Sequence, residues 1–274
     1  MLHAERKNTR FKCPQSLQKA AWPNTLRTTQ DSFRTLIFTM NATAILDELR
    51  PLGTASYKKV MLNHGIREPF FGVKISELQK IRKRIKKDYQ LARDLYETGN
   101  YDAMYLAGLI ADDERMTKAD LRNWARKAYC RALTGATVAW VAAGSRHGWD
   151  LGLEWIDSKD ELIASAGWGT LTSLVSIKAD AELDLAHLER LLVRVQKEIH
   201  KAPDVVRYQM NGFLISTAIY VEPLTAAALK IAEAIGPVSA DMGNTSCELP
   251  FAPDYIRKVQ DRGAIGKKRK SAKC

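Results

Sequence analysis

The chain has 274 residues, of which 46% are apolar and 27% charged, and its formal net charge is +11 at pH 7. This length and apolar content allow one or two domains with a sizeable core, and the absence of any run of 18 apolar residues excludes a membrane span. The four cysteines are scattered, with no CxxC pair and no zinc-like spacing to histidine. They favour reduced thiols in a reducing compartment, and we expect no metal site and no cofactor.

The positive charge is unevenly distributed. Residues 1–40 carry seven Lys or Arg against two acids and residues 254–274 carry eight against two, which leaves the body of the chain neutral. Within that body, residues 74–87 and 115–146 each hold seven cations and a single acid, whereas residues 150–198 hold ten acids and five bases. Two basic zones and one acidic zone indicate a directional binding face.

Residues 1–39 show no sustained apolar periodicity, and two prolines interrupt them. Their acid-poor, arginine-containing composition is weakly similar to a transit peptide, but we interpret them as a disordered tail or a mis-assigned start. Met40 is a natural beginning, because Asn41 or Thr43 can cap the first helix.

From Met40 onward, apolar residues spaced by three and four, with frequent breaks and no alternating strand, predict an all-α fold. Thirteen helices in pairs indicate stacked helical hairpins over residues 40–262, although no sequence period is visible. The segment 236–252 is rich in turn residues and is expected to pack as an ordered loop that closes the end of the solenoid. The predicted helices are 43–50, 54–63, 76–87, 88–98, 101–111, 117–131, 134–143, 147–157, 159–175, 184–200, 204–220, 223–235 and 253–262.

The helix predicted at 76–87 follows a phenylalanine–glycine turn and has Ser76 as its expected N-cap. Leu78, Ile81 and Ile85 form one narrow apolar stripe, and a solvated surface is the ordinary interpretation of the rest. Six cations within eight residues and no acid among them cannot pair along the helix, so phosphates are a better partner. These cations are Lys80, Arg82, Lys83, Arg84, Lys86 and Lys87.

Residues 63–112, which contain this turn, the basic helix and the run LA..LY..GNYDA..LA..IAD, resemble the DNA alkylation repair family. Weaker similarity continues through residues 153–168 and 205–216, so that the resemblance covers about residues 40–235. These AlkD-like DNA glycosylases are built from HEAT-like helical hairpins. The resemblance implies a C-shaped HEAT-like solenoid whose basic concave face holds duplex DNA. It also implies, for active members, cleavage of the N-glycosidic bond of alkylated purines without base flipping.

The active members place an aspartate at the damaged nucleotide, where a fixed anion stabilises the oxocarbenium-like charge that develops on the sugar. The resemblance puts this acid near Leu133 or Thr134, yet no Asp or Glu occurs between Asp120 and Asp150. The family's arginine falls near Ser165. The family's catalytic acid and arginine are therefore missing from this sequence.

Two aromatic positions of the family site have counterparts here, Tyr129 and Phe213. Weak replacements for the acid are Asp150 and Glu154, one helical turn apart, with an ordinary solvated helix surface as the alternative. Arg207 and Asn211 lie on the predicted helix that carries Phe213 and could reach a nucleotide, with hydrogen bonds between helices as the alternative.

The sequence predicts a DNA-binding protein of base-excision-type repair that has lost or rebuilt the glycosylase site. It would bind duplex or distorted DNA through electrostatic contacts to the phosphates. Because the sequence shows no set of side chains suited to contact base edges, we expect a preference for DNA shape or damage and not for a base sequence. The basic C-terminal tail, residues 263–274, could equally serve localisation or solubility. Besides the first basic helix, the predicted DNA contacts are Arg122, Arg126, Lys127, Arg131, Arg207, Asn211, Phe213, Lys267, Lys268 and Arg269.

Two alternatives remain open from the sequence. An active alkylpurine glycosylase with a relocated acid would release methylated bases, and a protein-binding helical scaffold would bind DNA weakly with little dependence on salt. The expected partner is DNA, without a membrane. The expected state is a cytoplasmic monomer, associated with the nucleoid in a bacterium.

Overall fold

A computed structural model describes residues 40–273, and these form one compact unit. The disordered tail or mis-assigned start predicted for residues 1–39 lies outside the described residues. The described part contains no strand, only an isolated bridge between Gly53 and Val73. Its thirteen α-helices are α1 (Ala42–Leu49), α2 (Ala55–Asn63), α3 (Ile75–Ile85), α4 (Tyr89–Glu97), α5 (Tyr101–Ile110), α6 (Lys118–Lys127), α7 (Ala139–Gly144), α8 (Gly148–Trp155), α9 (Glu161–Ile177), α10 (Leu185–Glu198), α11 (Asp204–Tyr220), α12 (Thr225–Ile235) and α13 (Ala252–Asp261).

Side-chain caps fix where many of these helices begin. Asn41, Asp88 and Asn100 each accept a hydrogen bond from the backbone N–H three residues further on, and Thr117 forms a capping box at the start of α6. These signals are local, so most predicted helices lie within two residues of the observed ones.

The predicted helix boundaries are wrong at α3 and in the segment from α6 to α7, where the helix predicted at 134–143 begins only at Ala139. Helix α3 begins after Lys74, which makes no side-chain cap, so the expected cap at Ser76 is not used. Asp102 on α5 accepts hydrogen bonds from the turn before α3, and this contact determines where α3 begins. The helix predicted at 117–131 ends at Lys127, and the π-helical segment η3 (Leu133–Val138) follows.

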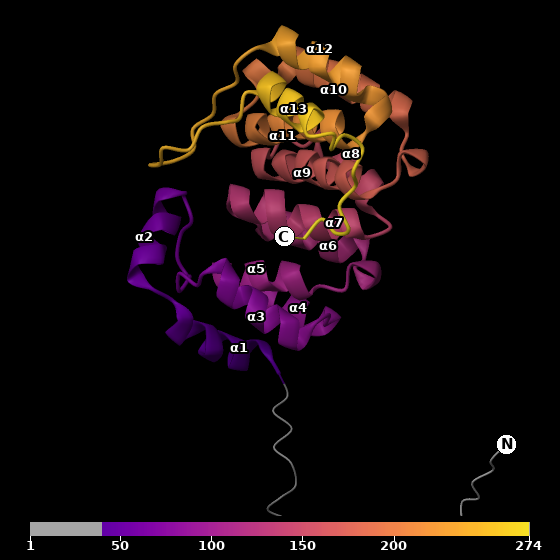
Figure 1. Cartoon of the computed structure of the whole chain (residues 1–274). Coiled ribbons are helices and arrows are strands. Elements are labelled where there is room, and N and C mark those ends of the chain that lie inside the picture. Colours follow the sequence, from indigo (N-terminus) through magenta and orange to yellow (C-terminus); the bar gives the residue numbers. More distant parts are fainter. Residues whose placement is uncertain (1–39, 274) are drawn as a thin grey trace, which may run out of the picture. The chain divides into compact units, whose positions relative to one another are not determined.

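The helices are arranged in two rows of successive pairs (Figure 1). One row, the buried row, comprises α5, η3–α7, α9 and α11, and every residue of α5 is buried. The other, the outer row, comprises α4, α6, α8 and α10, which pack on the buried row in order. This arrangement confirms the all-α prediction of stacked helical hairpins.

Aromatic side chains fill the layers between successive pairs. Tyr96 stacks on Trp124 with ring centroids 4.1 Å apart, and Trp168 meets Phe213 edge-on at 5.2 Å. All four side chains are fully buried, and burial of each large apolar side chain stabilises the fold by about 1.5–3 kcal/mol. The first contact joins two helices of the outer row, and the second joins α9 to α11 of the buried row.

The non-helical segment 236–251 connects the last helices with the first (Figure 1). The Asn211 Nδ2 donates to the carbonyl oxygen of Pro250 at 3.0 Å, and the backbone N–H of Asn244 donates to the carbonyl oxygen of Asn63 at 2.9 Å. The segment thus packs as an ordered loop. It contacts both α11 and the end of α2, whereas the sequence predicted only that it closes one end of the solenoid.

Among residues 40–273, no single helix combines the length and apolar character that a membrane span requires. Only the pair Asp204–Tyr220 and Glu222–Ile235 has that composition, and it is bent by 112°.

Candidate nucleic-acid interface

The basic helix α3 is anchored at its start by a buried carboxylate. The Asp102 side chain accepts backbone hydrogen bonds from Phe71 at 2.6 Å, Gly72 at 3.1 Å and Val73 at 3.0 Å. Gly72 has φ +81°, and a Cβ there would lie 2.8 Å from the Lys58 side chain, so this turn requires glycine. With the turn fixed and the apolar stripe of α3 buried, the cations of this helix point away from the core.

Three of the six cations of residues 80–87, on α3 and directly after it, have acidic partners that the sequence did not predict. One partner lies on α3 itself, one on α1, and one just after α5. These partners neutralise part of the basic surface, because an ion pair removes most of the local field of a cation. The pairs are Lys80–Glu77 at 2.8 Å, Arg84–Glu48 at 2.5 Å and Lys87–Asp112 at 3.8 Å.

The remaining cations gather at the C-terminal end of α3. Lys83 and Lys86 are exposed and form no ion pair with any residue that the structure describes, and Arg82 donates only to the Gln79 amide oxygen at 3.4 Å. Lys86 has φ +68° and is the one non-glycine residue of the described chain in the left-handed region. This end of the helix is the unneutralised part of the predicted DNA-binding surface.

Three cations of the second basic zone have acidic partners on neighbouring helices, two of them in the acidic zone that follows. Arg122 on α6 donates to Glu154 on α8 at 2.9 Å, and Lys127 pairs with Glu97 on α4. Arg126 is exposed on the same helix without an ion pair in the described part of the chain. The structure therefore places Arg122 and Lys127 within a network that joins the outer row.

The two candidate catalytic acids belong to this network. Asp150 pairs with Lys118 at 2.8 Å, and this hydrogen bond lowers the pKa of the Asp150 carboxyl below its usual value. The hydrogen bond from Arg122 likewise lowers the pKa of Glu154. Both carboxyls are ionised and solvent-accessible on the outer row, so neither has the desolvated setting that a relocated catalytic acid needs.

Two arginines on the other side of the buried row lie over tyrosine rings. The guanidinium of Arg131 lies 4.8 Å from the ring centre of Tyr208 and donates to the Met242 sulfur at 2.9 Å. The guanidinium of Arg67 lies 4.8 Å from the ring of Tyr129, whose hydroxyl donates to the Arg67 carbonyl oxygen. These contacts hold both guanidinium groups in place.

The positions that the resemblance assigns to the acid and the arginine are adjacent in space. Thr134 and Ser165 are fully buried, and their hydroxyl oxygens are 3.2 Å apart. The Thr134 hydroxyl also donates to the Arg131 carbonyl oxygen, so Ser165 is the donor in the pair. Thr134 lies in the π-helical segment η3, a geometry common at functional sites. Two neutral hydroxyls thus lie at the positions that the resemblance assigns to the acid and the arginine.

The predicted contacts on α11 are structural. The Arg207 guanidinium donates to the carbonyl oxygens of Ala202 and Ser239, both at 2.8 Å, and it pairs with Asp204. Asn211 is buried against the loop that contains Pro250. Phe213 is 0% exposed and packs on Trp168, so its assignment as a DNA contact is wrong. Arg207 thus binds carbonyl oxygens of the segments that follow α10 and α12, which resembles the structural alternative more than a free DNA contact.

The basic C-terminal residues pack along the domain, and we call residues 262–273 the C-terminal strap. The Lys268 Nζ pairs with Asp180 and donates to the Val175 carbonyl oxygen at 2.9 Å. The backbone N–H of Arg269 donates to the Ser176 carbonyl oxygen at 2.8 Å. Lys268 is therefore held at the end of α9, whereas Lys267 is exposed.

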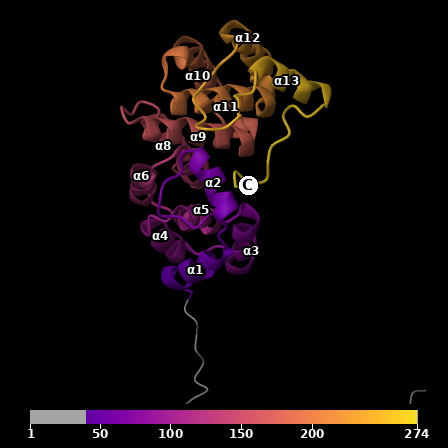
Figure 2. The ribbon, with the colours of Figure 1, turned by 90° about the vertical axis from the view of Figure 1, so that its left-hand side faces the viewer.

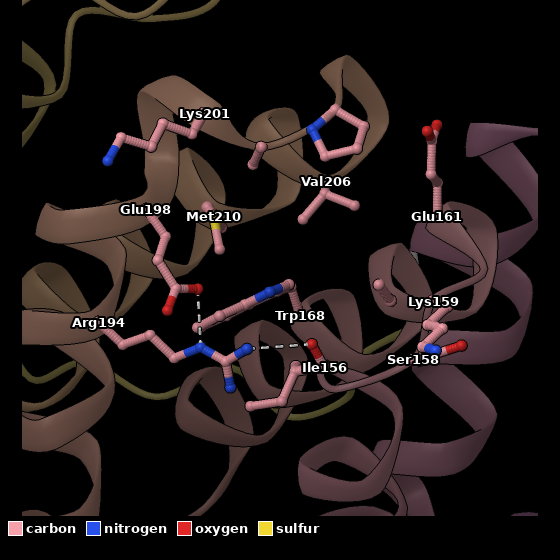
Figure 3. A pocket seen from close by; sticks show the side chains of 13 residues that line it. Ile156, Ser158, Lys159, Glu161, Trp168, Arg194, Glu198, Lys201, Val206 and Met210 are labelled. Carbon is pink, nitrogen blue, oxygen red and sulfur yellow. Dashed lines mark hydrogen bonds and ion pairs between the residues drawn. The ribbon is translucent and has the colours of Figure 1, made fainter.

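A pocket of about 300 Å³ lies between α9 and the α10–α11 junction, away from the α3 cations (Figure 3). Trp168 lines it, and Arg194 donates to Glu198 at 2.9 Å beside it. Its rim mixes lysines with glutamates, so it offers no preference for a polyanion. Residues 40–273 contain no group of three or more His, Cys, Asp or Glu placed to hold a metal ion.

The contacts of three residues were not predicted from the sequence: the ring contacts of Arg67 and Tyr208 and the buried ion pair of Lys273. No sequence pattern around Arg67 or Tyr208 predicts these contacts, because the partner of each residue lies more than 60 positions away along the chain. Lys273 belongs to the C-terminal basic cluster, but nothing in the sequence indicated that its side chain would be buried.

The chain is similar to a known protein family, to two bacterial proteins and to a solved structure. Residues 45–247 match a family described as DNA alkylation repair enzyme. Two proteins, Lin0241 of Listeria innocua and Lmo0209 of Listeria monocytogenes, are each 30% identical over 221 residues, which is 78% of this chain and 95% of theirs. A solved structure is similar with a TM-score of 0.80 and 37% identity, over 86% of this chain and 100% of that one. It is described as a new family of proteins related to the HEAT-like repeat DNA glycosylases with affinity for branched DNA structures.

Proposed function

The chain belongs to the DNA alkylation repair family, and from this premise we propose that it binds branched or distorted DNA without cleaving glycosidic bonds. The observation that carries the proposal is the C-terminal end of α3. There, Lys83 and Lys86 are exposed and lack acidic partners in the described residues, while Arg82 lies beside them. Closely spaced cations without acids are best stabilised by a polyanion, and the DNA backbone is the polyanion of this family.

A preference for branched DNA fits this concentration of charge. Contacts to phosphates position a protein on DNA but carry no sequence information. A junction brings the phosphates of two or more arms close together, so a compact group of cations gains more there than on one straight duplex. The solved relative with affinity for branched DNA supports the same preference.

The absence of glycosylase chemistry is supported by the hydroxyl pair at η3. Cleavage of an N-glycosidic bond develops positive charge on the sugar, which a fixed carboxylate would stabilise. Thr134 and Ser165 are neutral, buried and satisfied by each other. Asp150 and Glu154 are occupied by cations on the outer row. The residues therefore favour capture of DNA over cleavage.

The test measures affinity and base release side by side on four DNAs of equal length: a four-way junction, a fork, a plain duplex and a duplex containing N7-methylguanine. We expect the junction and the fork to bind about tenfold more tightly than the plain duplex, a difference of about 1.4 kcal/mol. We expect no free methylguanine under single-turnover conditions with protein in excess. Release of the base would contradict the non-cleaving assignment, and weak, salt-insensitive binding to all four would contradict DNA as the partner.

A further inference from the structure

The C-terminal strap crosses the ends of three helices of the buried row. Backbone N–H groups of Gly266 and Arg269 donate to carbonyl oxygens at the ends of α11 and α9, at 2.9 and 2.8 Å. The Lys273 Nζ donates to the Ala111 carbonyl oxygen at the end of α5, at 2.8 Å. Figure 2 shows the strap descending from α13 toward α3. Helix C-termini carry unpaired carbonyls and partial negative charge, so these donors stabilise the strap in place.

The end of the strap and the C-terminal end of α3 border a cavity of about 390 Å³ that is partly open to solvent. Its lining is strongly cationic, with two cations from α3, two from the residues directly after α3 and one from the strap, and it contains a single carboxylate. The charged groups are Arg82, Lys83, Lys86, Lys87, Lys273 and Asp113.

Lys273 is the buried member of this set. Its side chain is only 7% exposed, and its Nζ lies 2.7 Å from the Asp113 Oδ1. Burial lowers the pKa of Lys273, and the nearby cations Lys87 and Arg82 lower it further. Among the described residues, Asp113 beside Lys273 and Asp112 beside Lys87 are the two anions that pair with this group of five cations, so the cations keep much of their mutual repulsion.

We propose that this cavity is a phosphate-binding site, which takes a phosphoryl group of the DNA and which Lys273 of the strap completes. The inference rests on the proposed function, since it names the part of the DNA that the same end of α3 receives. Asp113 occupies Lys273 in the absence of phosphate. A bound phosphate adds negative charge beside cations that outnumber their carboxylate partners, and ammonium and guanidinium groups form strong charge-assisted hydrogen bonds to phosphate oxygens.

The decisive variant is Asp113→Asn, which removes the carboxylate that competes for Lys273. We expect its affinity for junction DNA to rise about three- to tenfold, the scale of one charged contact. The control is Asp150→Asn, which makes the same change in net charge at the Lys118 ion pair of the outer row. We expect the control to stay within about twofold of wild type. Thermal unfolding of each variant establishes that the protein binding DNA is folded.

A second variant separates the site from general electrostatics. Asp113→Asn combined with Lys273→Gln has the net charge of the wild type. We expect the gain of the single variant to disappear, because the phosphate loses its buried ligand. Equal affinities of Asp113→Asn and Asp150→Asn, or a gain that persists in the double variant, would overturn the site. If charge reversal of Lys83 and Lys86 still abolishes binding in that case, the proposed function stands without the cavity.

Two DNA substrates distinguish whether the bound phosphate is a strand end or an internal phosphodiester. A strand end in the cavity predicts tighter binding of 5′-phosphorylated than of 5′-hydroxyl forks, whereas an internal phosphodiester predicts equal binding of both. Either result, with the Asp113 effect present, supports the site. Inorganic phosphate added at constant ionic strength should compete with the DNA for wild type and compete less for the double variant. Equal competition for both would count against Lys273 as a ligand.

Discussion

Two surfaces of this domain are rich in cations and differ in what the neighbouring helices place opposite them. On the outer row, Arg122 and Lys127 meet Glu154 and Glu97 from the adjacent helices. At the C-terminal end of α3, no described acid pairs with Lys83 or Lys86. The comparison teaches that a basic run in a sequence marks a binding surface only where the fold supplies no acids to neutralise it.

The largest expected effect comes from charge reversal at the unpaired end. We expect Lys83→Glu with Lys86→Glu to weaken junction binding about 100-fold, because two phosphate contacts are lost and two repulsions are added. The matched control is Arg190→Glu with Lys197→Glu, which reverses two exposed cations of α10 and gives the same net charge. Fluorescence anisotropy at one salt concentration measures both, and equal losses in the two variants would show that net charge alone governs binding.

The next effect concerns the anchor of α3. Asp102→Asn removes the charge from the carboxylate that accepts three backbone hydrogen bonds from the turn before α3. We expect the free energy of unfolding to fall by about 2 kcal/mol, since hydrogen bonds to a charged group each contribute about 1.5–3 kcal/mol. Urea denaturation measures this loss. A variant as stable as the wild type would mean that the turn holds its shape without Asp102.

The smallest expected effect is a change in the pH dependence of thermal stability when the ion pairs of the outer row are removed. The hydrogen bonds from Arg122 and Lys127 lower the pKa of Glu154 and Glu97 in the folded protein. Their contribution to stability is therefore present above the unfolded pKa of about 4.3 and is lost as the pH falls through the folded values. We expect Glu97→Gln with Glu154→Gln to lose less in Tm than the wild type on acidification from about pH 6 to about pH 3. Parallel Tm curves would contradict the ion-pair account of the outer row.

The helices of this fold could be predicted because their signals are local. The side chains that cap α1, α4 and α5 stand next to the helices they begin, and the apolar stripe of α3 lies within one segment. The segment after Lys127 could not be predicted in the same way. Gly135 packs so closely on Gln209 that a Cβ would lie 1.9 Å from its amide nitrogen, and this contact joins distant parts of the chain.

The candidate site was predictable only in part. The cations of residues 80–87 are visible as a run, and the sequence shows no Asp or Glu between Asp120 and Asp150, where the resemblance expects the family's acid. The pairing of Arg122 with Glu154 and the burial of Lys273 against α5 join residues 32 and 162 positions apart, which no local pattern records. Phe213 looked like a site aromatic because its position matches one in the family, but its environment here is the core.

The most direct test of the central claim is the salt dependence of DNA affinity in paired alanine variants. Each phosphate contact adds about 0.9 to the slope of log affinity against log salt. We predict that Lys83→Ala with Lys86→Ala makes this slope shallower by about 2, while Arg122→Ala with Lys127→Ala leaves it unchanged. A shallower slope for the outer-row variant and an unchanged slope for the α3 variant would contradict the account.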